Sequence, residues 1–404
     1  MLAKINHFCC YVILLWSFLP IISVFQKSII VFVSVFFILL LWILTGLNLM
    51  RVNSRRICLR CILPFMSIII IYVLVEYGDI LLLGTYRYWL LIGFVVNSIY
   101  YIEKIDEQFC KRILLFSLFL LVVTAITTFT VLTTDINASR ILTSSSGESE
   151  LQIAYKQLNV GAFDFIYGLV IIIPLLFFFS IKQENKLYKV IIWCIVALFV
   201  LVVLMANYTT AFILLYVDFI FMLLMFFKIK NTFSLLAISL LFFVIAPFIL
   251  MTFLYMMIDY SGSISTQAKL EGLIDIISNK GSLDDTTSRW MLFLKSVESF
   301  SESPIWGVGA YYGSNKYVGQ HAQFIDDLAR YGLIGCIPLF SLLFVVFKKM
   351  KNKYEEIHIY NSRVLVPIFV FISLGFMNPV YVPCILACIF IIVPVVDSFC
   401  HEKA

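Results

Sequence analysis

Long apolar blocks recur along almost the whole chain, and they constrain the fold more than any other feature of the sequence. The 404 residues are 62% hydrophobic and only 13% charged, which is too little charge to cover a soluble protein of this size. The blocks are about 18–22 residues long, the length at which a helix crosses roughly 30 Å of hydrocarbon. We therefore predict an all-α, polytopic integral membrane protein.

Twelve such blocks can be read from the sequence, and we predict that they form a single transmembrane domain over residues 1–404. Their approximate ranges are 8–25, 28–48, 61–76, 80–100, 113–132, 159–180, 189–205, 210–227, 233–257, 332–347, 362–377 and 380–398. The first block follows Lys4 and has no small-residue cleavage site. It therefore reads as a retained signal-anchor helix and not as a removed signal peptide.

Basic residues occupy every second connection between the blocks. These connections are 51–60, 103–112, 181–189, 228–230 and 348–353. Lysine and arginine concentrate on the cytoplasmic side of membrane proteins, so twelve spans with both termini in the cytoplasm satisfy the alternation. The net charge of +5 then reflects membrane anchoring, and we expect no nucleic-acid partner.

Two sizeable loops remain on the outer side, at about 133–158 and 258–331. Neither loop contains cysteine, so no disulfide framework supports them. Cys58 and Cys61 have CxxC spacing, but no second pair and no histidine lie nearby. Paired acidic and histidine ligands are also absent from the sequence, so we expect neither a bound metal nor another cofactor.

The loop 258–331, between the ninth and tenth spans, is the only long segment that resembles a soluble protein. Residues 266–279 have apolar residues on one helical face, which predicts a helix on the membrane surface. A second helix is expected from about Arg289 to Phe300. Arg289 would then lie in the first turn, where the helix dipole does not favour a cation. Either it binds an anion, or it pairs with an aspartate just before it.

His321 opens the third expected helix of this loop, with apolar residues on the same face. Such a histidine is either a catalytic residue or a satisfied core residue. Asp326 and Arg330 have the i,i+4 spacing of an exposed ion pair. Arg330 lies nine residues after His321, about 180° round a helix, so we do not expect it to reach the same ligand.

Three further cations can face the outer side. Arg87 lies in the outer half of the fourth span, where an ionisable side chain is costly and is therefore a functional candidate; alternatively it snorkels to the head groups. Arg140 lies in the first outer loop, and Lys156 lies near the point where the chain re-enters the membrane. Together with Arg289, these residues could converge on an outer-leaflet cavity that suits a lipid diphosphate.

The order of motifs around His321 resembles the bacterial O-antigen polymerase and O-antigen ligase superfamily. In that family an external loop carries an arginine helix, a P-x-x-G-x-G stretch, a histidine and then G-x-x-G at the next span. Here Pro304, Gly307 and Gly309 precede His321, and after one residue and nine more comes Gly332-Leu333-Ile334-Gly335. The two glycines before the histidine suit a tight loop in which the backbone approaches a ligand.

The resemblance is sharpest over about residues 284–345, and it departs at one position. Ala322 stands where Asn, Ser or Gln usually follows the histidine, which leaves the histidine's partner open between Gln320 and Gln323. The family fold that the resemblance implies is the same many-span helical bundle with its large external loop.

The resemblance implies a glycosyltransferase that acts on undecaprenyl-diphosphate-linked oligosaccharide at the outer face of the bacterial inner membrane. His321 would be the general base, and Arg289, Arg140, Arg87 and Lys156 would bind the diphosphate and the glycan. A flippase and a chain-length regulator of the same pathway are the implied protein partners, besides the lipid bilayer.

Three functions stay open. A polymerase moves the glycan onto the next lipid-linked repeat, of O-antigen, capsule or exopolysaccharide, and a short chain rich in Ile and Phe favours this reading. A ligase, which shares the motif, moves it onto lipid A core. A polysaccharide flippase or other transporter would explain twelve spans, but not the loop 258–331 with its arginine–histidine order.

Overall fold

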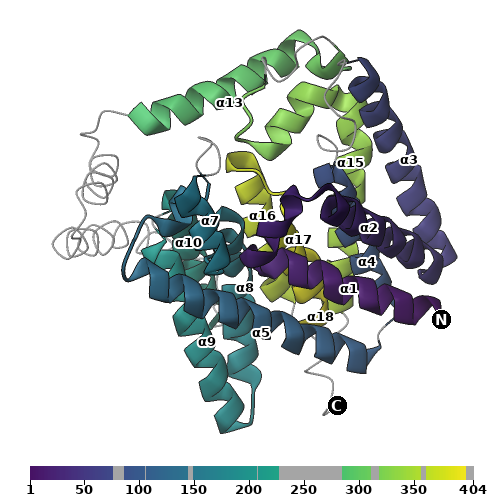
Figure 1. The fold of residues 1–404 in the computed structure, drawn as a ribbon. Helices are drawn as coiled ribbons and strands as arrows, with labels where there is room; N and C mark the ends of the chain where they lie inside the picture. The colour runs from purple at the N-terminus through teal and green to yellow at the C-terminus, as the bar shows by residue number, and fades with distance from the viewer. Residues whose placement is uncertain are drawn as a thin grey trace, which may run out of the picture.

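The structure, a computed structural model, describes residues 1–75, 86–104, 106–143, 149–206, 208–226, 284–310, 318–355 and 361–396. Within these ranges the protein is helical and contains no β-strand, as Figure 1 shows. Five of the described helices, α2, α5, α8, α9 and α15, are long and apolar enough to cross a membrane. The prediction of an all-α membrane protein is confirmed at this level, and the count of twelve spans stays a prediction.

The described helices fall into an N-terminal, a middle and a C-terminal part of the chain. The N-terminal part contains α1 (Leu2–Phe18), the 3-10 helix η1 (Pro20–Lys27), α2 (Ile29–Leu49), α3 (Val52–Val75), α4 (Tyr86–Glu103) and α5 (Glu107–Leu132). The middle part contains α6 (Ala138–Ile141), α7 (Glu150–Gln157), α8 (Phe163–Lys182), α9 (Lys186–Met205) and α10 (Thr209–Phe226). The C-terminal part contains α13 (Asp284–Glu302), the 3-10 helix η2 (Val308–Ala310), α15 (Gln323–Glu355), α16 (Asn361–Met377), α17 (Pro383–Ala387), the π-helix η3 (Cys388–Ile392) and α18 (Val393–Val395).

Most of the predicted blocks overlap with helices of the structure. The connection 51–60, which we predicted to link two spans, is itself largely helical. Helix α3 begins at Val52, so these basic residues form its first turns. Arginine, cysteine and leucine are compatible with a helix, and no glycine or proline interrupts them before Pro64. The ninth block, 233–257, and the surface helix at 266–279 lie outside the described residues.

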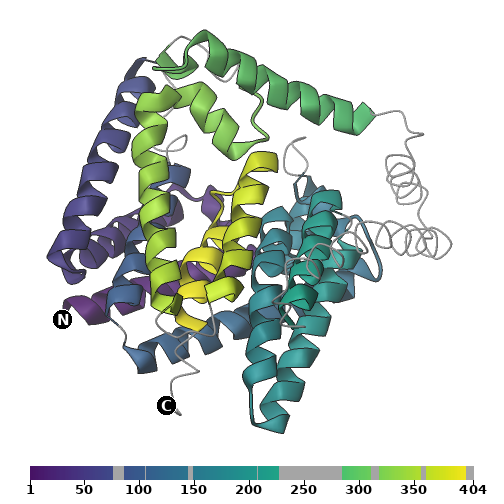
Figure 2. The same ribbon diagram turned by 180° about the vertical axis from the view of Figure 1, so that it is seen from behind.

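Helix α13 lies across one end of the bundle, and α3 and α15 run away from it toward the other end (Figures 1 and 2). Helix α15 packs against α13, α3, α4 and α16. It therefore connects the end that carries α13, called here the α13 end, with the opposite end of the molecule.

Helix α4 is enclosed by its neighbours and carries a buried polar network near its C-terminal part. The Asn6 side-chain amide donates to Asn97 Oδ1 at 2.7 Å and to Thr45 Oγ1 at 3.0 Å. The Tyr101 hydroxyl donates to Asn6 Oδ1 at 2.9 Å. These four residues, the Asn6 network, tie α1, α2 and α4 together by hydrogen bonds between helices.

Helix α15 bends at Gly332, which has φ 59° and ψ −168°. Directly after the bend in the chain, Leu333 N–H donates to the Pro304 carbonyl at 2.9 Å and Ile334 N–H donates to the Ile305 carbonyl at 3.1 Å. A Cβ atom on Gly307 would lie 2.5 Å from the backbone of α15. The glycine-rich stretch thus approaches the protein's own backbone, which is a structural reason for its glycines, and its approach to a ligand stays a prediction. We call residues 304–309 and 330–334 the glycine clasp.

Candidate functional site

The elbow between α13 and α15, residues 318–322, is held by a short chain of hydrogen bonds. Ser296 Oγ on α13 donates to Asp326 Oδ1 at 2.6 Å and accepts from Gly319 N–H at 2.8 Å. Asp326 Oδ2 accepts from Ala322 N–H at 3.0 Å. A carboxylate that accepts from backbone N–H groups at a helix start fixes the entry of the chain into that helix. The backbone on both sides of His321 is therefore anchored to α13 and α15.

His321 itself is exposed in this elbow, and α15 begins two residues later at Gln323. The prediction that His321 opens a helix is wrong, because the backbone hydrogen bonds of α15 begin with Asp326 N–H to the Ala322 carbonyl, one residue after His321. The alternative that His321 is a satisfied core residue is also wrong, because its side chain lies at the surface. An exposed imidazole on an anchored backbone can contact a ligand.

A buried charged cluster lies just beyond the elbow, where the first turns of α15 pack against the start of α4. The Tyr88 hydroxyl donates to Asp327 Oδ1 at 2.7 Å, and Gln323 Nε2 donates to the same oxygen at 3.0 Å. The guanidinium carbon of Arg87 lies 4.9 Å from the centroid of the Tyr88 ring. Arg87 and Arg330 both interact electrostatically with Asp327 and with each other. We call Arg87, Tyr88, Asp327 and Arg330 the arginine cluster.

The arginine cluster contains polar atoms that the described part of the protein does not pair. Arg87 Nε and Asp327 Oδ2 are buried and make no hydrogen bond there, and the same holds for the hydroxyl of Tyr381, whose ring packs against Tyr88. Asp327 and Tyr381 are only 1% and 2% exposed, whereas Arg87 and Arg330 each keep part of their surface accessible. Buried polar groups in native proteins are almost always paired. The cluster therefore has hydrogen-bonding capacity that a ligand can use.

The prediction for Arg330 needs correction. Asp326, its expected partner in an exposed pair, is buried at 8% exposure and gives its two oxygens to Ser296 and Ala322. Asp326 and Arg330 still attract each other, and Arg330 also interacts with Asp327, which it shares with Arg87. The argument that Arg330 points away from the ligand of His321 assumed one continuous helix, which the structure does not have. The i,i+3 spacing of Asp327 and Arg330 was the available sequence signal.

Arg140 lies in different surroundings from Arg87. It belongs to α6, and its guanidinium carbon lies 5.9 Å from the centroid of the Tyr208 ring on the segment before α10. The Tyr208 hydroxyl donates to the Ser139 carbonyl at 2.8 Å. The contacts described for Arg140 and Arg87 thus involve different residues, and their convergence on one cavity stays a prediction.

The binding of diphosphate and glycan by Lys156 and Arg289 also stays a prediction. Lys156 is half-buried in the last turn of α7. That helix is held in place by the Tyr155 hydroxyl, which donates to the Asp135 carboxylate; burial and this hydrogen bond raise the pKa of Tyr155 to about 12. Arg289 falls within α13, and its side chain lies outside the described residues. Because α13 begins at Asp284, Arg289 is not in the first turn, and the dipole argument does not apply.

A second unpaired carboxylate, which the sequence reading missed, lies in α10. Asp218 is fully buried, and neither of its oxygens has a hydrogen-bond partner in the described part of the chain. The available signal was a single acidic residue inside the apolar block 210–227. No described cation interacts with it, which distinguishes Asp218 from Asp327.

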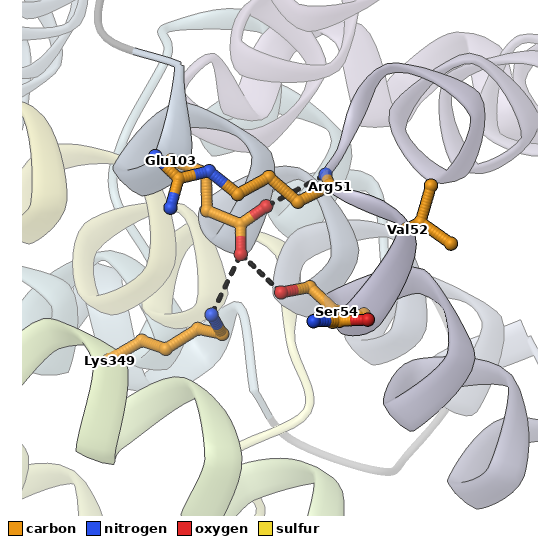
Figure 3. A pocket seen from close by; sticks show the side chains of 6 residues that line it. Arg51, Val52, Ser54, Glu103 and Lys349 are labelled. Carbon is orange, nitrogen blue, oxygen red and sulfur yellow. Dashed lines mark hydrogen bonds and ion pairs between the residues drawn. The ribbon is translucent and has the colours of Figure 1, made fainter.

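At the opposite end, a pocket of about 330 Å³ is lined by residues of α3, α4 and α15 together with Arg51 (Figure 3). Glu103 Oε1 accepts from Lys349 Nζ at 2.7 Å and from the Ser54 hydroxyl, and Oε2 accepts from Arg51 N–H at 2.9 Å. Both oxygens of this carboxylate are paired within the protein. We assign the pocket a structural role as a tie between the three helices.

In the part of the chain that the structure describes, no group of three or more His, Cys, Asp or Glu side chains is arranged to hold a metal ion. Comparison with protein-family models and with curated proteins gave no match. The functional argument therefore rests on the motifs of the sequence and on the geometry of the elbow and the arginine cluster.

Proposed function

We propose that this protein is a membrane glycosyltransferase that polymerises undecaprenyl-diphosphate-linked oligosaccharide repeats into O-antigen or a related surface polysaccharide. The observation that carries the proposal is that an exposed histidine directly precedes the helix turns that hold the buried arginine cluster. His321 precedes Asp327 by six residues, and both belong to the junction between α13 and α15. A proton acceptor beside fixed cations is what glycosyl transfer from a diphosphate needs.

In the proposed reaction, the bond between the anomeric carbon and the diphosphate oxygen breaks, and the same carbon bonds to the acceptor hydroxyl oxygen. His321 takes the proton of that hydroxyl, because an imidazole accepts a proton near neutral pH. Undecaprenyl diphosphate leaves with the electron pair of the broken bond. Arg87 stabilises its charge, with Arg140, Arg289 and Lys156 as the further proposed cations.

The proposal places the α13 end at the outer face of the bacterial inner membrane, with twelve spans and both termini in the cytoplasm. The basic residues Arg51 and Lys349 at the opposite end support this orientation. Single cysteines at Ser301 and Asn352, both exposed, test it with a membrane-impermeant thiol reagent on intact cells. Ser301→Cys should react and Asn352→Cys should not; the reverse pattern contradicts the orientation.

The function is tested first by the surface glycan of a deletion strain. Single repeats attached to lipid A core are expected for a lost polymerase. Long chains retained on the lipid carrier would identify a ligase instead, and lipid-linked repeats confined to the cytoplasmic leaflet would identify a flippase.

The role of His321 is tested with purified protein and lipid-linked repeat units. His321→Ala should reduce polymerisation by roughly 10²–10⁴-fold, the usual contribution of a general base, while the protein still inserts and unfolds as the parent does. His358→Ala is the matched control, because the charge pattern predicts that it lies on the cytoplasmic side. Full activity of His321→Ala would remove His321 as the base.

A further inference from the structure

Two arginines share one carboxylate in the arginine cluster, and this arrangement needs a physical reason. Arg87 and Arg330 each interact with Asp327, and their like charges also oppose each other. Bringing two cations together away from water is unfavourable unless anions compensate for both. Among the described residues, Asp327 is the carboxylate that interacts with both arginines, whereas Asp326 interacts with Arg330 and gives its oxygens to the elbow.

Asp327 is held in a way that leaves half of its carboxylate unused. Its Oδ1 accepts from both Tyr88 and Gln323, so two neutral donors fix the side chain. Its Oδ2 and Arg87 Nε make no hydrogen bond in the described part of the protein. The carboxylate therefore balances the arginines by charge without closing the two-point hydrogen-bonded pair that arginine forms with carboxylates. An incoming anion can take the donor that Asp327 does not occupy.

The position of Arg330 is specified by the glycine clasp. A Cβ atom on Gly309 or on Gly307 would lie 2.5 Å from the Arg330 carbonyl oxygen. Only glycine at both positions lets the loop pack directly onto the backbone of Arg330. The hydrogen bonds from Leu333 and Ile334 to the same loop secure the turn that follows it. The clasp thus fixes one wall of the arginine cluster.

We propose that Arg87 and Arg330 form a two-arginine binding site for a phosphate or diphosphate ester, with Asp327 as its internal counter-ion. The identification of that ester with the diphosphate of a polyprenyl carrier rests on the proposed function. In this site Arg330 takes part directly in binding, Asp327 lowers the affinity for the anion, and the glycine clasp positions Arg330.

The test measures binding to the purified full-length protein in detergent, with farnesyl diphosphate, inorganic pyrophosphate and farnesol as probes. Farnesyl diphosphate should bind, and Arg87→Gln and Arg330→Gln should each weaken it roughly ten- to hundredfold, the value of a charged hydrogen bond. Arg330→Lys should be intermediate, because lysine keeps the charge but not the planar two-point contact. Tighter binding of farnesyl diphosphate than of pyrophosphate identifies a lipid-borne ester; equal binding of the two contradicts that part of the proposal.

The most discriminating variant is Asp327→Asn. If Asp327 competes with the anion, binding should become tighter, and if Asp327 only holds the structure together, binding should become weaker. The asparagine keeps an acceptor for Tyr88 and Gln323 but removes the competing charge, so the affinity for farnesyl diphosphate should rise severalfold. Asp218→Asn, a buried carboxylate without a described cation, should leave it unchanged. Weaker binding in Asp327→Asn, or wild-type binding in Arg330→Gln, overturns the proposal.

The binding site and the polymerase activity can fail independently. If the variants change binding as expected but the parent protein does not extend lipid-linked repeats, the site stands and the proposed function fails. If polymerisation depends on His321 while binding is unchanged in the arginine variants, the site fails and the function stands. Unfolding temperatures of all variants are measured in parallel, so that a misfolded variant is not counted as a loss of binding.

Discussion

Helix α4 carries two buried polar clusters that differ in how completely they are satisfied. The Asn6 network and the arginine cluster are ten residues apart on this helix, between Arg87 and Asn97, or about 15 Å along its axis. Every side-chain amide and hydroxyl of the Asn6 network is hydrogen-bonded, whereas the arginine cluster leaves Arg87 Nε and Asp327 Oδ2 unpaired in the described part of the chain.

The difference separates a structural role from a binding role on the same helix. A neutral network with all its partners joins helices and has nothing left to offer a ligand. A charged cluster with unused donors and acceptors costs stability by itself, and such clusters persist where a ligand completes them. If this comparison is right, substitutions in the first cluster change stability and substitutions in the second change activity.

Among substitutions in these two clusters, the largest expected effect is that of Arg87→Gln on activity. Polymerisation of lipid-linked repeats should fall roughly 10²–10³-fold, as when one fixed donor to a developing charge is removed. The unfolding temperature in detergent should fall far less than the activity, because Arg330 remains to balance the charge of Asp327 when Arg87 is neutralised. Arg56→Gln, an exposed arginine of α3, is the control. If the unfolding temperature of Arg87→Gln falls together with its activity, the arginine cluster has a structural role, as the Asn6 network does.

Gly332→Ala should affect stability and activity together, because the glycine clasp belongs to both. Its φ of 59° with ψ −168° is nearly restricted to glycine and costs another residue about 1–3 kcal/mol. The new Cβ would also collide with the Ile305 carbonyl oxygen, so the clasp must open and Arg330 must shift. Rates and unfolding temperatures both report this. Leu333→Ala, next to it and 42% exposed, should change little; equal effects of the two substitutions would contradict the role of the clasp.

The sequence predicted the helical class and most of the helices because apolar blocks of span length have few alternatives. It also singled out His321 and Arg87 as unusual polar residues. It could not place His321 in an elbow, since that depends on the left-handed Gln320 and on Ser296, which is 30 residues before Asp326 in the chain. The role of Arg330 was missed because a regular helix was assumed from His321 to Arg330, whereas α15 begins only at Gln323.

Asn6→Ala should destabilise the protein without changing the activity of the folded fraction. The substitution removes the acceptor of the Tyr101 hydroxyl and the donor to Asn97 Oδ1. Losing such buried interhelical hydrogen bonds costs about 1–3 kcal/mol. The free energy of unfolding and the rate per folded molecule separate the two effects, with the exposed Asn53→Ala as the control. A lower rate per folded molecule would show that the network also shapes the site.

The smallest effect is expected at the opposite end, from Lys349→Gln. Glu103 is paired with Lys349 but keeps its hydrogen bonds from Arg51 N–H and Ser54 when that partner is lost. Lys349 is 28% exposed, so the ion pair contributes no more than about 1 kcal/mol. Polymerisation should be unchanged. Glu103 and Asp327 are thus both largely buried carboxylates next to cations, yet only Asp327 lacks protein donors for one oxygen. A loss of activity in Lys349→Gln would mean that α15 transmits a change from one end to the other, and the local contrast between satisfied and unsatisfied clusters would then no longer explain the site.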